Sequence, residues 1–314
     1  MAGSPDANRA TSAVPSAALD LTGDLLCASC GYNLRGLSIR DVCPECSLPV
    51  RATLLARVDP RAQELRPLYA PLASAFGIAA WGWGLMVAAV ATWAMRLLDL
   101  AVGNGPRHAL SNELAYTGLA SLIFAGVGAL TLIRPHGGIP VWKSVAGAIG
   151  AIAYAPLCFM YYSIHVMLDA GFDRPYLDPA TVDAAAVAER SLARLLLGVA
   201  AVVAVLGIRP IARVLVARSA VLRRRAVDRQ TLLVAAASLG VGMVGDALGM
   251  ALPVFDTSLA STLRVVQVAL VAVSSVLLTA AIAAAFVDVV KLVPVVARKP
   301  LHLADVFGPR DGNE

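Results

Sequence analysis

The sequence has few charged residues, few aromatic residues and almost no lysine. Charged residues make up 15 % of the 314 residues and aromatic residues 6 %, whereas 58 % are hydrophobic. A soluble protein needs more polar surface than this, so the composition excludes an ordinary soluble domain and indicates a membrane protein. Lysine occurs 3 times against 23 arginines, which we attribute to base-composition bias in the genome and not to function.

Catalytic motifs are also missing. The sequence has no H-E-x-x-H, no G-x-S-x-G and no glycine-rich phosphate loop, so it does not predict an enzyme. The run from Gly242 to Asp246 resembles the intramembrane G-x-G-D motif of prepilin peptidases, which also carry a cytoplasmic four-cysteine motif, but it misses the spacing by one residue. Asp288, the other candidate aspartate, lies near the opposite side of the membrane, which argues further against that activity.

Residues 1–22 lack the apolar stretch of roughly 7–15 residues that a secretory signal needs, and we expect them to form a disordered tail. The rest of the chain divides by composition. We expect a four-cysteine module at 23–52, a juxtamembrane linker at 53–71, a transmembrane domain at 72–290 and a cytoplasmic tail at 291–314.

Six apolar runs are each long enough to cross a hydrocarbon core of about 30 Å as a helix. The predicted fold is therefore an all-α polytopic membrane protein with six transmembrane helices and a small N-terminal module. The fourth span is the shortest, but Asp178 and Pro179 upstream of it are typical of a helix start, so a helix can start outside the membrane and run through Arg190 and Arg194 into that span. The predicted spans are 72–95, 114–133, 144–168, 192–208, 231–255 and 263–290.

The distribution of Lys and Arg predicts the orientation. With the N-terminus inside, the inside segments hold 20 of the 26 basic residues, as the positive-inside rule requires. We therefore expect an integral protein of the cytoplasmic (inner) membrane with both termini in the cytosol. The segment 209–230, with Arg223, Arg224 and Arg225, suits a helix in the inner interface that contacts anionic lipid. A simple topology signal also explains its charge, and nucleic-acid binding is not predicted.

Four of the five cysteines form two C-x-x-C pairs, Cys27 with Cys30 and Cys43 with Cys46, separated by twelve residues. Two such pairs let two turns face each other and present four thiolates tetrahedrally. Four close cysteines in the reducing cytosol more often bind a metal than form disulfides. The motif therefore predicts a metal site.

The run CASCGYNLRGLSIRDVCPEC resembles the short zinc ribbon of uncharacterised membrane proteins from planctomycete-like bacteria. That family usually has glycine after the last cysteine, where this chain has Ser47. The run also resembles rubredoxin-like iron sites. The resemblance covers some 25 residues and implies a closed structural Zn²⁺ site, with iron as the alternative. We expect Tyr32, Leu34 and Leu37 to pack around the site, and Arg35 and Arg40 to contact a partner or lipid headgroups.

Polar residues inside the spans are candidates for function. Asp246 in the fifth span lies beside a face of small residues, Ser238, Gly242, Gly245 and Gly249, and we expect it to point toward Ser274 or Ser275. The third span has a stripe of residues that line a polar cavity or a helix contact: Tyr154, Cys158, Tyr161 and His165. Arg194 and Asp288 lie near predicted span ends, where they can reach the interface.

Three functional hypotheses follow. The first is a non-enzymatic membrane protein whose zinc ribbon docks a cytosolic protein. The second is a small-solute or ion transporter that uses Asp246, with the ribbon as a regulatory cap. The third is an electron-transfer protein with iron in the ribbon.

Overall fold

The computed structural model describes residues 20–57, 67–102, 109–168, 184–219, 231–255 and 257–298. These residues fall into two compact units: residues 20–57 belong to an N-terminal unit, and residues 67–298 belong to a helical unit. Each unit has a hydrophobic core of its own. No β-strand occurs in the described ranges, in agreement with the predicted all-α class.

The N-terminal unit consists of turns followed by one short helix, α1 (Val50–Arg57). Isolated antiparallel bridges pair Asp20 with Ser38, Leu26 with Asn33, and Val42 with Pro49. Its buried core is small and includes two cysteines: Leu21, Leu25, Cys27, Leu34, Cys43 and Val50. The module boundary expected at residue 52 falls inside α1, so the folded module is longer than the cysteine pattern indicates.

The described part of the helical unit contains six helical segments long and apolar enough to cross a membrane, as predicted. The third segment is formed by α4, α5 and a π-helical turn, η3. The bounds of the elements are α2 (Pro71–Val102), α3 (Ala109–Thr131), α4 (Val141–Ile152), α5 (Tyr154–Tyr162), η3 (Ser163–Met167), α6 (Ala184–Val216), α8 (Thr231–Ala251), the 3₁₀ turn η7 (Leu252–Val254) and α9 (Thr257–Ala297).

Helix α6 differs most from its predicted span of 192–208. Its apolar segment runs over Val187–Val216, so it continues past arginines at both ends of the predicted span. On the C-terminal side, the segment 209–230 was expected to form a helix in the inner interface, but Ile211 and Leu215 within it are buried in the core of the helical unit. Residues 209–216 therefore continue α6, and Arg223, Arg224 and Arg225 lie outside the described residues.

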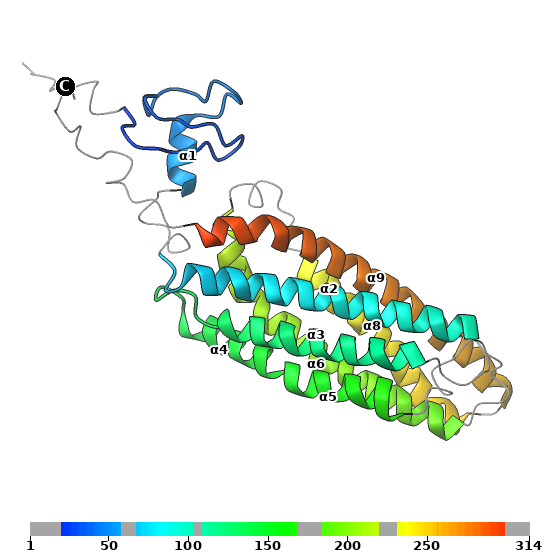
Figure 1. Cartoon of the computed structure of the whole chain (residues 1–314). Helices are drawn as coiled ribbons and strands as arrows, with labels where there is room; N and C mark the ends of the chain where they lie inside the picture. Colours follow the sequence, from blue (N-terminus) through cyan, green and yellow to red (C-terminus); the bar gives the residue numbers. More distant parts are fainter. Residues whose placement is uncertain are drawn as a thin grey trace, which may run out of the picture. The chain divides into compact units, whose positions relative to one another are not determined.

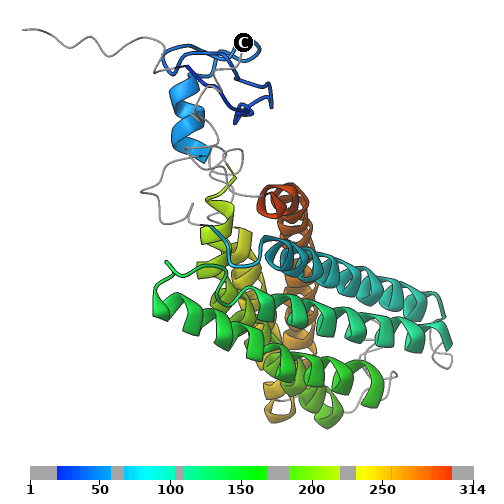
Figure 2. The same cartoon turned by 60° about the vertical axis from the view of Figure 1, so that its left-hand side comes forward.

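The six segments pack in a ring that follows the order of the chain (Figures 1 and 2). Helix α2 packs on α3, α3 on α4 and α5, these on α6, α6 on α8, and α8 on α9. Helix α9 then packs against α2 and closes the ring. Helices α6 and α9, which are not adjacent in the ring, make little contact with each other. The centre of the ring is therefore a place where a cavity can form.

Small residues allow neighbouring helices in the ring to approach closely. A Cβ atom at Gly207 of α6 would lie 2.6 Å from the carbonyl oxygen of Ala146 on α4. The small-residue face predicted on α8 is buried, and a Cβ at Gly242 would lie 2.6 Å from Oγ of Ser274 on α9. The small side chains of this face therefore let α9 approach α8 closely.

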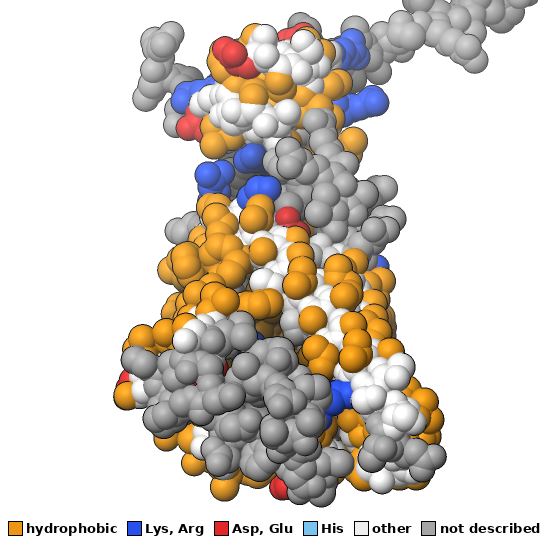
Figure 3. Space-filling view, turned by 90° about the vertical axis from the view of Figure 1, so that its right-hand side faces the viewer, with side chains coloured by type: hydrophobic (Ala, Val, Ile, Leu, Met, Phe, Trp, Pro, Cys, Tyr) orange, Lys and Arg blue, Asp and Glu red, His pale blue; other side chains and the backbone are white. Residues whose placement is uncertain are grey.

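The outside of the helical unit is strongly apolar. Figure 3 shows hydrophobic side chains covering much of one face. Helix α9 is the most exposed, since 11 % of its most apolar stretch is buried, and Val265 and Val276 on it are more than half exposed. A contiguous apolar surface of this extent is typical of contact with lipid chains.

Candidate functional site

The two C-x-x-C turns of the N-terminal unit have the same backbone hydrogen bonds. In the first turn, the N–H of Cys27 donates to the carbonyl of Tyr32 at 2.7 Å, and the N–H of Gly31 donates to the carbonyl of Cys27 at 3.1 Å. In the second turn, the N–H of Cys43 donates to Leu48 and that of Ser47 to Cys43, both at 2.8 Å. Because the two turns share the same backbone hydrogen bonds, each presents its two thiols in the same way, as the sequence motif predicts.

Both turns require a left-handed backbone after the second cysteine. Gly31 has φ +79° and Ser47 has φ +56°. Glycine adopts this region without steric strain, whereas serine does so at a cost. The second turn therefore has the same left-handed backbone conformation as the first, although Ser47 stands where the family that the sequence resembles usually has glycine.

The four sulfur atoms of the two turns lie close together. Sγ of Cys27 lies 3.5 Å from Sγ of Cys46, and Sγ of Cys30 lies 3.5 Å from Sγ of Cys43. All four lie within 4.8 Å of one another. Zinc–sulfur bonds of about 2.3 Å at tetrahedral angles place sulfurs about 3.8 Å apart, so this donor set fits a tetrahedral metal ion.

The thiols differ in their acidity. Burial opposes ionisation of Cys27, but the N–H groups of Cys30 and Ser29 and the neighbouring sulfurs stabilise its thiolate and lower its pKa to about 6. At Cys30 the N–H of Tyr32 favours the thiolate, yet desolvation and the three neighbouring sulfurs raise its pKa to about 12. Because thiolates are the metal-binding form, metal binding would release the remaining protons.

Helix α1 supports the first turn through two residues that the sequence pattern does not mark. Oγ1 of Thr53, which is fully buried, lies 4.0 Å from Sγ of Cys27 and accepts a hydrogen bond from the N–H of Ala28 at 3.3 Å. Nη2 of Arg57 donates to the carbonyl of Cys27 at 3.4 Å. Their role depends on α1 folding back over the first turn, which the spacing of the cysteines cannot show.

The surface of the module differs in part from the prediction. Leu34 is fully buried and Leu37 packs against the same core, as expected. Tyr32 was expected to pack as well, but it is 42 % exposed, because its backbone closes the turn while its side chain points outward. Arg35 and Arg40 are exposed, and Nη1 of Arg35 lies 3.8 Å from Oδ1 of Asp24.

In the helical unit, Asp246 forms an ion pair with Arg194. Nε of Arg194 on α6 lies 3.1 Å from Oδ1 of Asp246 on α8, and both side chains are largely buried. Ser274 and Ser275, toward which Asp246 was expected to point, line the same cavity as Asp246, and Ser274 donates to the carbonyl of Ser238 at 2.7 Å. Helix α6 starts at Ala184, so Arg194 lies within the helix, and its side chain is held in this ion pair.

Further polar contacts surround this ion pair on neighbouring helices. Nε2 of Gln267 on α9 donates to Oγ of Ser191 on α6 at 3.2 Å. Nη2 of Arg190 donates at 3.0 Å to the carbonyl of Ile164, which lies in the π-helical turn η3. Turns of this kind frequently mark functional sites.

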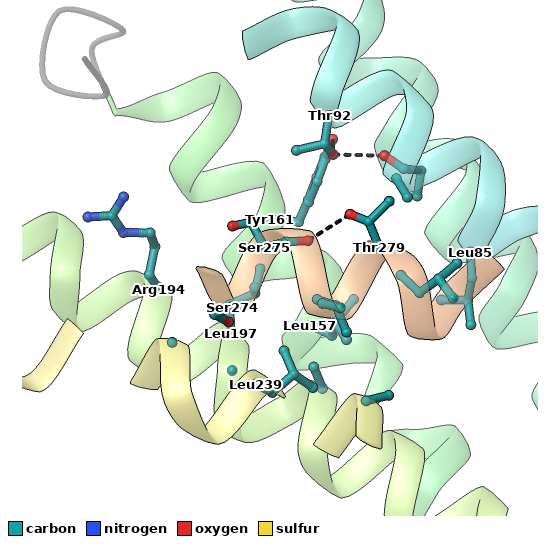
Figure 4. Close-up of a pocket in the computed structure, with 18 of the residues that line it drawn as sticks. Leu85, Thr92, Leu157, Tyr161, Arg194, Leu197, Leu239, Ser274, Ser275 and Thr279 are labelled. Atoms are coloured by element: carbon teal, nitrogen blue, oxygen red, sulfur yellow. Dashed lines mark hydrogen bonds between the residues drawn. The ribbon is translucent and has the colours of Figure 1, made fainter. Parts of the chain in front are cut away.

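The stripe predicted on the third span lines the ring's interior in part. Nε1 of Trp81 donates to the hydroxyl of Tyr154 at 2.8 Å, and the hydroxyl of Tyr161 bonds Thr92 at 3.1 Å. The rings of Tyr161 and His165 are 4.4 Å apart. Tyr154, Tyr161, His165 and Asp246 line one cavity of about 430 Å³ at the centre of the ring. Figure 4 shows this cavity with part of its lining. Arg194 and Gln267 also line it and were not among the predicted site residues.

Comparison with known proteins finds no relative of this chain. No protein-family model matches the chain, and no curated protein and no solved structure matches it at a significant level. The likeness of residues 27–46 to a zinc ribbon therefore rests on the residues and their geometry alone.

Proposed function

We propose that this chain is an integral protein of the cytoplasmic membrane with both termini in the cytosol. In this proposal its four-cysteine module holds a structural Zn²⁺ ion and docks a cytosolic protein. The observation that carries it is the convergence of Cys27, Cys30, Cys43 and Cys46 within 4.8 Å from two equal turns. Four protein ligands fill a tetrahedral shell, so zinc bound here would keep no position for water or substrate and would serve to fix a surface.

The surface that the metal would fix is suited to protein contact. Tyr32, Arg35 and Arg40 are exposed on the described module. Tyrosine and arginine are the residue types enriched in protein interfaces, since both offer a large apolar body with a polar end. Docking through a rigid module also agrees with the lack of a catalytic motif in the sequence.

Metal identity is tested by elemental analysis and a visible spectrum of the detergent-purified full-length protein. We expect one zinc per chain and no visible absorption. One iron per chain with a red, reducible chromophore would replace this assignment and point to electron transfer, because tetrahedral sulfur sites also hold iron.

Docking is tested by comparing the proteins that co-purify with three forms of the full-length chain. The double variant Arg35→Glu/Arg40→Glu should keep its zinc and lose its partner. Arg51→Glu is the matched control, since Arg51 is an exposed arginine of the same module on α1. Identical co-purifying proteins in all three preparations would contradict docking through this surface.

A second candidate function is a proton- or ion-coupled transporter, favoured by the position of Asp246 on the wall of the central cavity. Proteoliposomes with a trapped pH-sensitive dye would report proton flux. This candidate requires that Asp246→Asn abolish the flux while Asp288→Asn, near the end of α9, retains it. Equal flux in both variants and the wild type would remove it.

A further inference from the structure

The central cavity is long as well as large. Along α9 its lining runs from Gln267 to Ala285, which corresponds to about 27 Å of helix and nearly spans a hydrocarbon core. Two lining residues, Leu97 and Ala272, are exposed, so the cavity opens to the surface of the helical unit. In Figure 4, Arg194 and Leu85 lie toward opposite ends of the site.

The middle of the cavity offers few free hydrogen-bond donors. Thr92 donates to the carbonyl of Ala88, and each described hydroxyl of α9 that lines the cavity donates to a main-chain carbonyl. Ser274 bonds Ser238, Ser275 bonds Val271, and Thr279 bonds Ser275, all at 2.7–2.8 Å. Because these protons are already used, the wall between the two ends favours a hydrocarbon over a hydrated solute.

One end of the cavity is charged. Among the described lining residues the charged side chains are Arg96, Arg194 and Asp246, and Gln267 lies beside them. Asp246 pairs with Arg194, so the charges of these described lining residues sum to one positive charge, and Arg96 carries it. An anionic headgroup complements that charge, whereas a cationic headgroup does not.

We propose that the cavity binds one hydrocarbon chain of an anionic amphiphile, with the headgroup beside Arg96 and the Arg194–Asp246 pair and the chain along α9. The shared chemistry is a long apolar chain that ends in a carboxylate or phosphate group. This inference is independent of the metal module and of protein docking.

Tryptophan positions provide the test. Trp81 and Trp93 line the cavity, whereas Trp83 and Trp142 are 54 % and 61 % exposed on the outside of the unit. The full-length variant Trp83→Phe/Trp142→Phe keeps the inner pair as reporters, and Trp81→Phe/Trp93→Phe keeps the outer pair. Each is titrated in detergent with 9,10-dibromostearate, whose bromine atoms quench indole fluorescence at short range.

We expect saturable quenching of the inner pair that excess unbrominated stearate reverses. The outer pair should be quenched only in proportion to the probe dissolved in the micelle. Phosphatidylglycerol with the same brominated chain, in a parallel titration, distinguishes a phospholipid from a free fatty acid as the source of the chain. Unsaturable quenching of both pairs by both probes would overturn the proposal.

Variants of the lining separate cavity binding from micelle partition. In the inner-reporter background, Ala201→Phe narrows the cavity from α6 and should remove the saturable component. Val203→Phe, two residues away and outside the lining, should not. If Ala201→Phe does not elute as a single species, Ala89→Phe narrows the cavity from α2 instead. The proposal would be overturned if a variant that narrows the cavity and remains well folded still showed saturable quenching.

Substitution of Arg96 tests the contact between the charged end of the cavity and the anionic headgroup. Arg96→Gln should weaken binding of dibromostearate about tenfold, because it removes a charge-assisted contact. Arg264→Gln, on a partly buried arginine outside the lining, should leave the affinity unchanged. Equal affinity in both variants would contradict the anionic headgroup.

Discussion

The two units of the chain are stabilised in different ways. The N-terminal unit has a core of a few leucines and a valine around two buried cysteines, which is too little apolar surface to fold a module of this size without a further link. The helical unit is stabilised by packing within the chain itself, through glycines that bring helices together and polar groups that are buried as pairs. We therefore expect the folding of the first unit, and not that of the second, to respond to removal of a metal ion.

The largest expected effect follows from removing the metal. Structural zinc contributes about 10–16 kcal/mol to folding in small zinc modules, so Cys43→Ser should unfold the module and leave the spans intact. Trypsin should then cleave after Arg35, Arg40 and Arg51, which it spares in the wild type. Cys158→Ser, at the fifth cysteine, is the control and should keep the metal and the resistance. A trypsin-resistant Cys43→Ser module would show that it folds without metal.

The next effect concerns the buried ion pair. Arg194→Gln removes the arginine that pairs with Asp246 in the cavity wall, and breaking a buried pair costs about 3–5 kcal/mol. We expect a lower thermal unfolding midpoint of the detergent-purified protein for Arg194→Gln. The double variant Arg194→Gln/Asp246→Asn should recover most of the loss. If the double variant is as unstable as the single one, the charge pair is not the cause.

A smaller effect is expected where α4 and α6 meet. Gly207→Leu places a side chain against the backbone of α4, and overpacking of this kind typically costs about 1–3 kcal/mol. Gly240→Leu is the matched control, because a Cβ at Gly240 meets no atom within 4 Å. Thermal unfolding should shift downward for Gly207→Leu alone. Equal shifts in both variants would contradict the close contact of α4 with α6.

The smallest expected effect is an increase in the stability of the four-cysteine module. Ser47 adopts a positive φ, and relief of this strain by Ser47→Gly should stabilise the module by about 1 kcal/mol. Slower release of zinc to a competing chelator would measure it. Ser29→Gly, in the other turn and without a positive φ, should not slow release. Faster release from Ser47→Gly would show that the serine side chain supports the turn.

The parts of the structure that sequence analysis could predict depend on local composition. Six apolar runs predict six helices because hydrophobic length alone decides whether a helix can cross a membrane. The spacing of Cys27, Cys30, Cys43 and Cys46 predicts their convergence because each pair forms a local turn. Both predictions need no knowledge of which helix lies beside which.

The parts that could not be predicted depend on contacts between distant segments. The helix-start signal at Asp178 and Pro179 indicated a helix that runs through Arg194, and α6 does so from Ala184 onward. The pairing of Arg194 with Asp246 joins two helices, and no local pattern marks it. Thr53 and Tyr32 show the same limit, since the orientation of each side chain follows from how α1 and the turns fold together.

The contact of α2 with α9 has a consequence for assembly. These helices are the first and the last of the ring, so the cavity is complete only after the final helix has been made and inserted. Contacts between such distant segments form slowly, because the intervening chain must first be ordered. If the cavity binds a hydrocarbon chain as proposed, the incomplete ring leaves one side open during that interval, and the hydrocarbon can enter there before α9 packs against α2.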